Sequence, residues 1–131
     1  MTDLDEARDF FGNDIYATKT TGIELAEVSD GYAKCRLPIT ETLMNAAGSV
    51  MGGAIYTLAD FSFAAATNAP GRLTVTTTSN ISYFASPQGD VLFSECRVVK
   101  DGKRNCFAET TITDGRDRVV ARVTACGVHL S

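Results

Sequence analysis

The chain has 131 residues, of which 44% are hydrophobic and 21% are charged, and its net charge is −4. This length suits one buried core, so we predict a single domain over residues 1–131. The negative charge offers no basic field for nucleic acid, and no apolar run reaches the roughly 20 residues that span a bilayer. The start, MTDLDEARDFF, lacks the basic and apolar order of an export signal. We therefore expect a cytoplasmic protein that binds neither nucleic acid nor a membrane.

The cysteine and histidine content does not favour a metal site. No CxxC pair occurs, and His129 is the only histidine. A structural zinc site needs four such ligands at close spacing, so no metal is predicted. Each cysteine lies inside a strand-like segment, which indicates free buried thiols in a reducing compartment. The four are Cys35, Cys96, Cys106 and Cys126.

The first third of the chain reads as a helix and a hairpin. Residues 2–14 form a short acidic segment with helical character that Gly12 and Asn13 end. Residues 22–39 contain two alternating runs about an Asp30–Gly31 turn, which is typical of a β-hairpin. The following stretch, TETLMNAAGS, reads as a loop.

A second helix is predicted over about residues 50–67, with Ser49 as its N-cap and NAPG as its stop. It is apolar nearly all the way round, so it has to be buried on most sides. Asp60 is its only ionisable side chain apart from Tyr56. A carboxylate moved out of water costs several kcal/mol unless it is paired or protonated. The position of Asp60 therefore needs a functional or structural explanation.

Four β-rich runs follow, over residues 72–86, 90–100, 103–114 and 117–130, with turn residues between them. They predict an antiparallel meander, and the whole pattern predicts an α+β hotdog fold. In that fold one long antiparallel sheet wraps around a central apolar helix, here with a short N-terminal helix added. Five polar residues of the first run would share one face, lining a wet cleft or facing solvent. They are Thr74, Thr76, Thr78, Asn80 and Ser82.

The stretch NAAGSVMGGAIYTLAD resembles the motif of PaaI-like hotdog acyl-CoA thioesterases, which runs Asn-x-x-Gly-x-x-His-Gly-Gly and then Leu-(Ala/Val)-Asp. The later TTTSNISYFASP is similar to the next strand of that family. The resemblance implies hydrolysis of an acyl-CoA thioester, often aryl or medium-chain, without a cofactor beyond the coenzyme A of the substrate. The matching positions are Asn45, Gly48, Gly52, Gly53, Leu58, Ala59 and Asp60.

By this resemblance Asp60 acts as nucleophile or general base, and the N–H of Gly52 binds the thioester oxygen. Asn45 would help to place the attacking water or the carbonyl, and Thr76 is the best match for an assisting hydroxyl. The chemistry fits, because the first N–H groups of a helix lack partners and lie at its positive end. Glycine lets a substrate approach them closely. The alternatives are that Gly52 and Gly53 only permit tight packing and that Asp60 only accepts structural hydrogen bonds, from Ser62, Thr57 or a neighbouring loop.

Spacing along the helix predicts a dimer. Asp60 follows Gly52 by eight residues, roughly 12 Å at about 1.5 Å per residue, so one thioester carbon cannot touch both in one chain. In a two-fold dimer, Gly52 and Asn45 of one subunit would face Asp60 and Thr76 of the other. We expect at least a homodimer, and the resemblance favours a homotetramer.

The sequence departs from the family motif at Met51, which stands where the histidine usually precedes Gly-Gly. Methionine carries no proton, so we expect an apolar wall of the substrate site there, next to Gly53. His129 could stand in only if the fold brought it close, and we expect it to be a surface residue. The basic turn Lys100, Lys103 and Arg104 either holds the phosphates of coenzyme A or is a solvated hairpin tip, and Arg72 is a weaker candidate.

Two other functions stay open. Because Met51 breaks the motif, the chain could bind acyl-CoA without hydrolysing it, although pure binding would be better served by an apolar residue in place of Asp60. A hydratase or dehydratase on the same fold usually relies on a catalytic histidine, and none lies near the central helix in the sequence.

Overall fold

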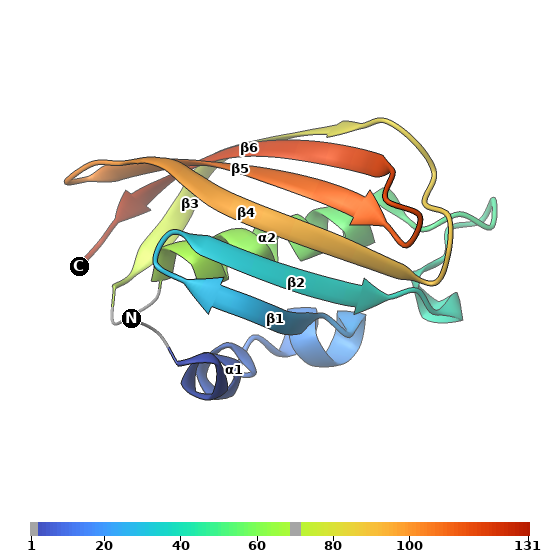
Figure 1. Ribbon diagram of the computed structural model, residues 1–131, viewed down its shortest axis with the longest axis horizontal. Helices are drawn as coiled ribbons and strands as arrows, with labels where there is room; N and C mark the ends of the chain where they lie inside the picture. Colours follow the sequence, from blue (N-terminus) through green and yellow to red (C-terminus); the bar gives the residue numbers. More distant parts are fainter. Residues whose placement is uncertain (1–2, 69–71) are drawn as a thin grey trace.

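The computed structural model describes residues 3–68 and 72–131. Six strands in these ranges form one antiparallel sheet in the order β1-β2-β4-β5-β6-β3, which curves around the long helix α2 (Figure 1). The predicted α+β arrangement of a sheet around a central helix is confirmed. The helical elements are α1 Leu4–Phe11, the π-helix η1 Tyr16–Thr21, the 3-10 helix η2 Glu41–Leu43 and α2 Gly52–Asn68. The strands are β1 Glu24–Ser29, β2 Tyr32–Pro38, β3 Thr74–Tyr83, β4 Val91–Asp101, β5 Asn105–Asp114 and β6 Val119–His129.

The predicted N-terminal helix and hairpin are confirmed. The Asp3 side chain caps α1 by accepting from the N–H of Asp5, and the N–H of Gly12 closes the last turn on the carbonyl of Arg8. β1 pairs with β2 about the predicted turn. Gly31 in that turn has φ +73, a conformation that favours glycine.

Helix α2 begins later than predicted. Val50 is paired with Met44 in an isolated β-bridge, and the N–H of Met51 donates to the carbonyl of Leu43 at 2.8 Å. The chain before Gly52 is therefore extended, so Ser49 is not the N-cap. The predicted stop begins at Asn68, which is the last residue of α2, and its remaining residues 69–71 lie outside the described residues.

The meander prediction is wrong for the strand that follows α2. Strands β4, β5 and β6 do pair consecutively, but β3 pairs with β6, and β2 takes the place beside β4. Residues 84–90, predicted to contain a tight turn, instead connect strands that are not neighbours in the sheet (Figure 1). This order encloses α2 between two distant ends of the sheet, and it leaves β3 as an edge strand.

The predicted single polar face of β3 is also wrong. The pair Thr76–Gly127 is followed by Thr78–Cys126, so Thr77 is an extra residue that forms a β-bulge. The bulge reverses the side-chain alternation. Thr74 and Thr76 therefore point to the helix side of the sheet, whereas three residues after the bulge point to the outer side. These three are Thr78, Asn80 and Ser82.

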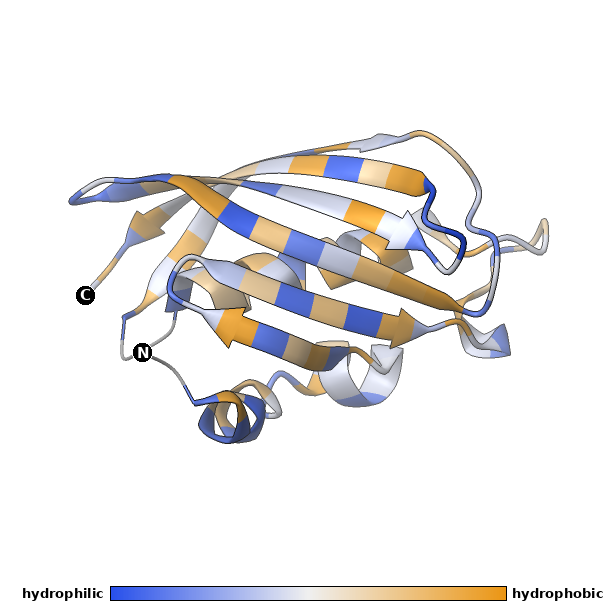
Figure 2. Ribbon diagram, in the orientation of Figure 1, coloured by the Kyte–Doolittle hydropathy of each residue, from blue (hydrophilic) through white to orange (hydrophobic). Residues whose placement is uncertain are grey.

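The core lies between α2 and the concave face of the sheet, where hydrophobic and polar residues alternate along the strands (Figure 2). Most of α2 is buried, including Leu58, Phe61 and Phe63. Among the charged side chains, only Asp60 interrupts this helix. No helix in the described ranges is both long enough and apolar enough to cross a membrane. The four cysteines are free thiols, and Cys35, Cys96 and Cys106 are buried.

Candidate active site

The N-terminus of α2 opens into a depression of about 370 Å³. The N–H groups of Ala54 and Ile55 both bond to the carbonyl of Met51, whereas those of Gly52 and Gly53 have no acceptor within the described residues. These two donors lie at the positive end of the helix dipole. The arrangement is suited to an oxygen that carries negative charge. The depression is lined by Asn45, Ser49, Val50, Gly52, Ile55, Tyr83, Phe84, Ala85, Ser86 and Pro87.

The loop before α2 is organised by Asn45. Its Oδ1 accepts from the N–H groups of Ala47 and Ser49, at 2.9 and 3.0 Å. Gly48, within this loop, has φ +83, which favours glycine. The side-chain oxygen of Asn45 is therefore committed to the loop, and only its amide nitrogen remains to meet a substrate or water.

Tyr83 contacts the first turn of α2 and was not found by sequence reasoning. Its hydroxyl donates to the carbonyl of Gly52, at 2.8 Å. A Cβ at position 52 would lie 3.1 Å from that hydroxyl oxygen, whereas a Cβ at Gly53 would meet nothing within 4 Å. Tight packing therefore explains glycine at position 52, and it does not explain Gly53.

Asp60 lines a second depression, of about 300 Å³, between α2 and the segment that leads into η1. The hydroxyl of Ser62 donates to the carbonyl of Leu58, and that of Thr57 donates to the carbonyl of Gly53. Neither reaches Asp60, for which the described part of the chain supplies no hydrogen-bond donor. A purely structural role of Asp60 is therefore not supported. The walls are formed by Asp14, Ile15, Tyr16, Ala17, Thr57, Asp60, Phe61 and Ala64.

The surroundings of Asp60 partly oppose the ionisation of its carboxyl group. The residue is exposed at the surface of the chain, yet apolar neighbours withdraw its carboxyl group from part of the water. This partial burial raises the pKa of Asp60, and the negative charge of Asp14 raises it further. Burial also raises the pKa of Asp14. The two carboxylates thus share one depression, in which each is partly withdrawn from water.

Within one chain the predicted catalytic residues do not form one site. Gly52 and Asn45 line the depression at the helix N-terminus, and Asp60 lines the other. Thr76 is exposed on the edge strand β3, and no hydrogen bond in the described ranges joins it to Asp60. This separation agrees with the predicted split of the site between two subunits.

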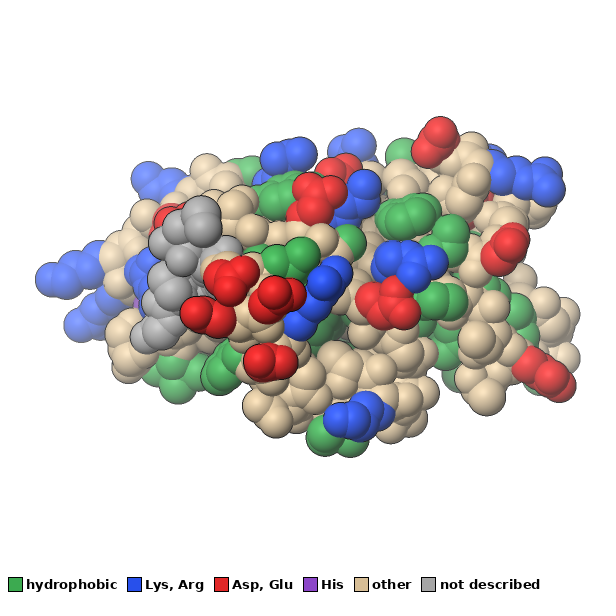
Figure 3. Space-filling model, turned by 60° about the horizontal axis from the view of Figure 1, so that its bottom comes forward, with side chains coloured by type: hydrophobic (Ala, Val, Ile, Leu, Met, Phe, Trp, Pro, Cys, Tyr) green, Lys and Arg blue, Asp and Glu red, His purple; other side chains and the backbone are tan. Residues whose placement is uncertain are grey.

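The predicted substrate-binding residues lie in different places. Met51 is exposed next to the first turn of α2, beside Gly53. The basic turn between β4 and β5 lies near the C-terminus, at the end of the molecule opposite the start of α2 (Figure 1). Lys and Arg side chains project from that end (Figure 3). In one chain Lys100, Lys103 and Arg104 line neither depression, so their binding role stays a prediction.

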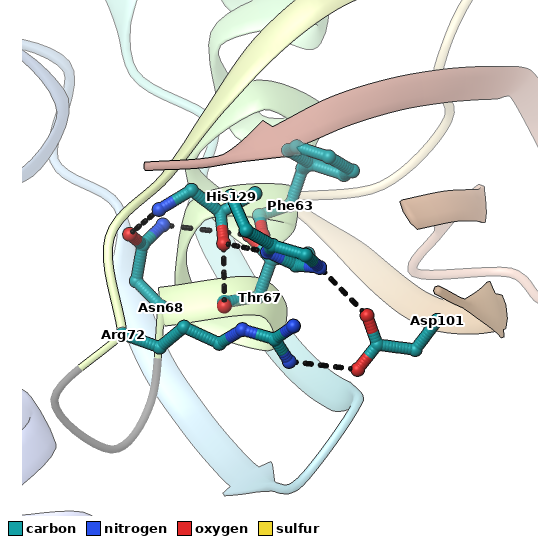
Figure 4. Close-up of polar contacts among 7 residues, drawn as sticks. Phe63, Thr67, Asn68, Arg72, Asp101 and His129 are labelled. Atoms are coloured by element: carbon teal, nitrogen blue, oxygen red, sulfur yellow. Dashed lines mark hydrogen bonds and ion pairs between the residues drawn. The ribbon is translucent and has the colours of Figure 1, made fainter. Parts of the chain in front are cut away.

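His129 is not the surface residue that was expected. Its side chain is only 4% exposed and bridges Thr74, 2.7 Å from Nδ1, and Asp101, 2.7 Å from Nε2 (Figure 4). Asp101 also accepts from Arg72 at 2.9 Å. This cluster lies at the C-terminal end of α2, so His129 cannot replace the missing motif histidine beside Gly52 of its own chain. Arg72 is likewise occupied by Asp101.

Comparison with known proteins gives the family. The model of the thioesterase superfamily matches residues 47–121, which include Gly52, Asp60 and Thr76. The chain belongs to the thioesterase superfamily. The PaaI-like thioesterase family and the class of enzyme predicted from the sequence are thus confirmed at the level of the superfamily.

Among individual relatives, a putative esterase of Archaeoglobus fulgidus is 30% identical over 98 residues, 74% of this chain. The match spans 64% of that relative, less than two thirds of its length. The acyl-coenzyme A thioesterase PaaI of Escherichia coli is 28% identical over 116 residues, 88% of this chain and 82% of that protein.

Solved structures confirm the hotdog fold. The Escherichia coli PaaI structure matches with a TM-score of 0.86 and 23% identity, covering 98% of this chain and 97% of that one. A thioesterase protein of Streptococcus pneumoniae, solved with coenzyme A, matches with a TM-score of 0.85 and 23% identity. That match covers 95% of this chain and 97% of the other.

Proposed function

We propose that this protein hydrolyses the thioester of an aryl or medium-chain acyl-CoA, in a site shared by two subunits. One observation carries the proposal: the free N–H group of Gly52 and the unpaired carboxylate of Asp60 lie in two separate depressions on the same helix. These are the two halves that thioester hydrolysis requires, an oxyanion donor and a base or nucleophile. A two-fold arrangement of helices would bring the halves together.

The reaction needs only water as second reactant. With Asp60 as base, the carboxylate takes a proton from water while the oxygen attacks the thioester carbon. The N–H of Gly52, aided by that of Gly53, holds the oxyanion. The C–S bond then breaks, and the thiolate of coenzyme A receives the proton. With Asp60 as nucleophile, its carboxylate attacks the thioester carbon and the C–S bond breaks, which releases the thiolate of coenzyme A and leaves a mixed anhydride. Water then cleaves the anhydride to the free acid and the Asp60 carboxylate, and its proton passes to the thiolate.

The family supports Asp60 and Thr76 in these roles. Two solved structures of the Streptococcus pneumoniae thioesterase carry alanine in place of an aspartate and of a threonine that lie sixteen positions apart. Asp60 and Thr76 are separated by the same interval. We assign the threonine hydroxyl to placing water or the leaving group, and the amide nitrogen of Asn45 to the carbonyl side of the substrate.

A homodimer is the smallest working unit in this proposal. β3 is an edge strand of ten residues in which only Thr74 is buried, and such an edge presents unpaired N–H and C=O groups. Pairing with a second copy would cover it. The same pairing would bring α2 of the two copies toward each other, as the split site requires.

A thiol-release assay with a panel of acyl-CoAs tests the proposal, with Asp60→Asn as the variant and Asp9→Asn, an exposed carboxylate on α1, as the matched control. We expect turnover of one acyl class by the wild type and by Asp9→Asn, and a loss of several orders of magnitude in Asp60→Asn. Saturable binding without turnover in all three proteins would instead identify an acyl-CoA-binding protein.

The Asp60→Asn variant should remain folded. Because the folded protein raises the pKa of Asp60, the ionised carboxylate costs stability once the pH rises above that pKa, and the cost is present at neutral pH. Its melting temperature at pH 7 should therefore be no lower than that of the wild type.

A further inference from the structure

The depression around Asp60 contains a second carboxylate, Asp14, at a position fixed by its backbone. The N–H of Asp14 donates to the carbonyl of Phe11, at 2.9 Å. The carbonyl of Asp14 accepts from both the N–H and the hydroxyl of Thr18, each at 2.9 Å. Asp14 thus joins the end of α1 to the first turn of η1. Its place on the wall of the depression is determined by these elements.

Neither carboxylate has a cationic partner. No Lys, Arg or His lines this depression, and the ion pairs of the described residues involve neither Asp14 nor Asp60. Apart from these two residues, the lining is apolar or carries only a hydroxyl group, so it offers burial to an acyl chain and no counter-charge. Its other members are Ile15, Tyr16, Ala17, Thr57, Phe61 and Ala64.

We propose that Asp14 determines the charge specificity of the acyl site, so that neutral acyl chains are accepted and acyl chains ending in a carboxylate are rejected. The proposal rests on the hydrolysis at Asp60 proposed above. The acyl chain continues from the thioester carbon, which must lie next to Asp60. A neutral chain gains apolar contact with Ile15, Tyr16 and Phe61.

Entry of an anionic acyl chain into the same depression would be energetically unfavourable. Its carboxylate would give up water and meet two like charges, and no donor on the walls would replace that water. Repulsion between charges grows as water is displaced from between them. Within the chain, burial raises the pKa of Asp60 and the charge of Asp14 raises it further. A terminal carboxylate of the substrate would meet the same field.

Hexanoyl-CoA and adipyl-CoA test the proposal, because their acyl groups have the same length and differ in a terminal carboxylate. The ratio of their kcat/KM values is measured for the wild type, for Asp14→Asn and for Asp9→Asn, which removes an equal charge from α1 outside the depression. We expect the wild type to prefer hexanoyl-CoA. Asp14→Asn should reduce this preference about tenfold, or ~1.4 kcal/mol, and Asp9→Asn should leave it unchanged. An unchanged ratio in Asp14→Asn, or an equal change in Asp9→Asn, would overturn the proposal.

Measurements of binding test the charge specificity independently of the proposed hydrolysis. The thioether analogues S-hexyl-CoA and S-carboxypentyl-CoA cannot be hydrolysed, and their dissociation constants are measured by calorimetry on the same three proteins. Tighter binding of the neutral analogue, with the preference reduced in Asp14→Asn, supports charge selection even in the absence of any turnover. Equal binding of the two analogues by the wild type would contradict it, whatever the activity.

Discussion

The hydroxyl of Tyr83 donates a hydrogen bond of 2.8 Å to the carbonyl oxygen of Gly52, and this bond ties the end of β3 to the first turn of α2. The ring also occupies the space that a side chain at position 52 would need, since a Cβ there would lie 3.2 Å from the ring carbon Cζ. Next to it, Gly53 faces open space. The packing of Tyr83 therefore requires glycine at position 52, whereas no contact within the chain requires glycine at position 53.

Alanine substitutions at the two positions should therefore have different effects on activity and stability. In Gly52→Ala the new methyl group displaces Tyr83 and stands beside the oxyanion donor, so we expect kcat to fall by about 10²-fold or more. In Gly53→Ala the methyl group meets nothing within one chain, and alanine favours a helix over glycine by up to about 1 kcal/mol. Its melting temperature should be equal or higher. Calorimetry and steady-state kinetics measure both effects, and equal losses of activity and stability in the two variants would contradict the distinction.

The acid side of the pH profile should report on Asp14. Asp60 must be ionised to act, and burial together with the charge of Asp14 raises its pKa. Activity should thus be lost as the pH falls through a value above the ordinary range of about 4 for aspartate. Asp14→Asn removes one of the two causes, so its acid limb should lie at lower pH. The profile of kcat/KM for hexanoyl-CoA measures this, and a limb that stays in place would show that Asp14 does not act on Asp60.

Asp114 should hold the wall of the Gly52 depression in place. It is fully buried, and its carboxylate accepts from the N–H groups of Gln88, Arg116 and Arg118 and from the Arg118 side chain. Gln88 lies on the connection after β3 that lines the depression through Ser86, and Arg118 also donates to the carbonyl of Ser86. We expect Asp114→Asn to reduce the free energy of unfolding by on the order of 2 kcal/mol at pH 7.

The destabilisation in Asp114→Asn should depend on pH. Burial alone would raise the pKa of Asp114, but the hydrogen bonds outweigh it and hold the value at about 2. The folded pKa thus lies below the unfolded value of about 3.9, so the contribution is complete above pH 4 and is lost as the pH falls toward 2. Urea unfolding at pH 7, 4 and 3 should show the difference between the variant and the wild type shrink. Asp90→Asn, exposed on the same connection, is the control.

His129 should matter for stability and not for chemistry. It is buried at the C-terminal end of α2, where it joins β6 to Thr74 of β3 and Asp101 of β4 (Figure 4). Replacing it by alanine removes both hydrogen bonds. Thr74 keeps its bond to the carbonyl of Thr67, and Asp101 keeps its bond from Arg72, so we expect a loss of about 1 kcal/mol. We expect His129→Ala to unfold at lower urea concentration, while kcat per folded molecule changes less than twofold. A large fall in kcat at full folding would assign His129 to the reaction.

Mixed subunits should reveal a shared site. Asp60→Asn and Gly52→Ala are each expected to be inactive alone, but a mixed dimer contains one site with both residues intact. Random assembly of equal amounts makes half of the dimers mixed, so about a quarter of the wild-type activity should return. Co-expression with two affinity tags and a thiol-release assay measure this. If each chain carried its own complete site, no activity would return.

Local features of this protein were predictable from its sequence, and contacts between distant segments were not. The first helix and the Asp30–Gly31 hairpin follow from stop and turn signals within a few residues. The central helix follows from its apolar run, although its start at Gly52 was not predicted. The motif resemblance located Gly52 and Asp60. The pairing of β3 with β6 joins residues that are 38 to 55 positions apart in the sequence, and no local signal distinguishes it from a pairing with β4.

The same limit explains the residues that were missed or misplaced. Asp14 gains its role only where the segment before η1 packs against α2, and Tyr83 only where the end of β3 reaches Gly52. His129 was expected at the surface because it stands near the end of the sequence, but its partners come from two other strands. Burial of a single polar residue is a property of the assembled sheet.

The bulge at Thr77 determines which side chains in the second half of β3 face α2. Thr76 and Tyr83 are seven residues apart, an odd number that would place them on opposite faces of a regular strand, yet both face α2. Deleting Thr77 would restore strict alternation, and all the remaining side chains of β3 would stay on their present faces. Inserting one residue after the bulge would invert the rest of the strand and turn the Tyr83 hydroxyl away from Gly52. At this point of β3, the chain should therefore keep the orientation of Tyr83 after loss of one residue but not after gain of one.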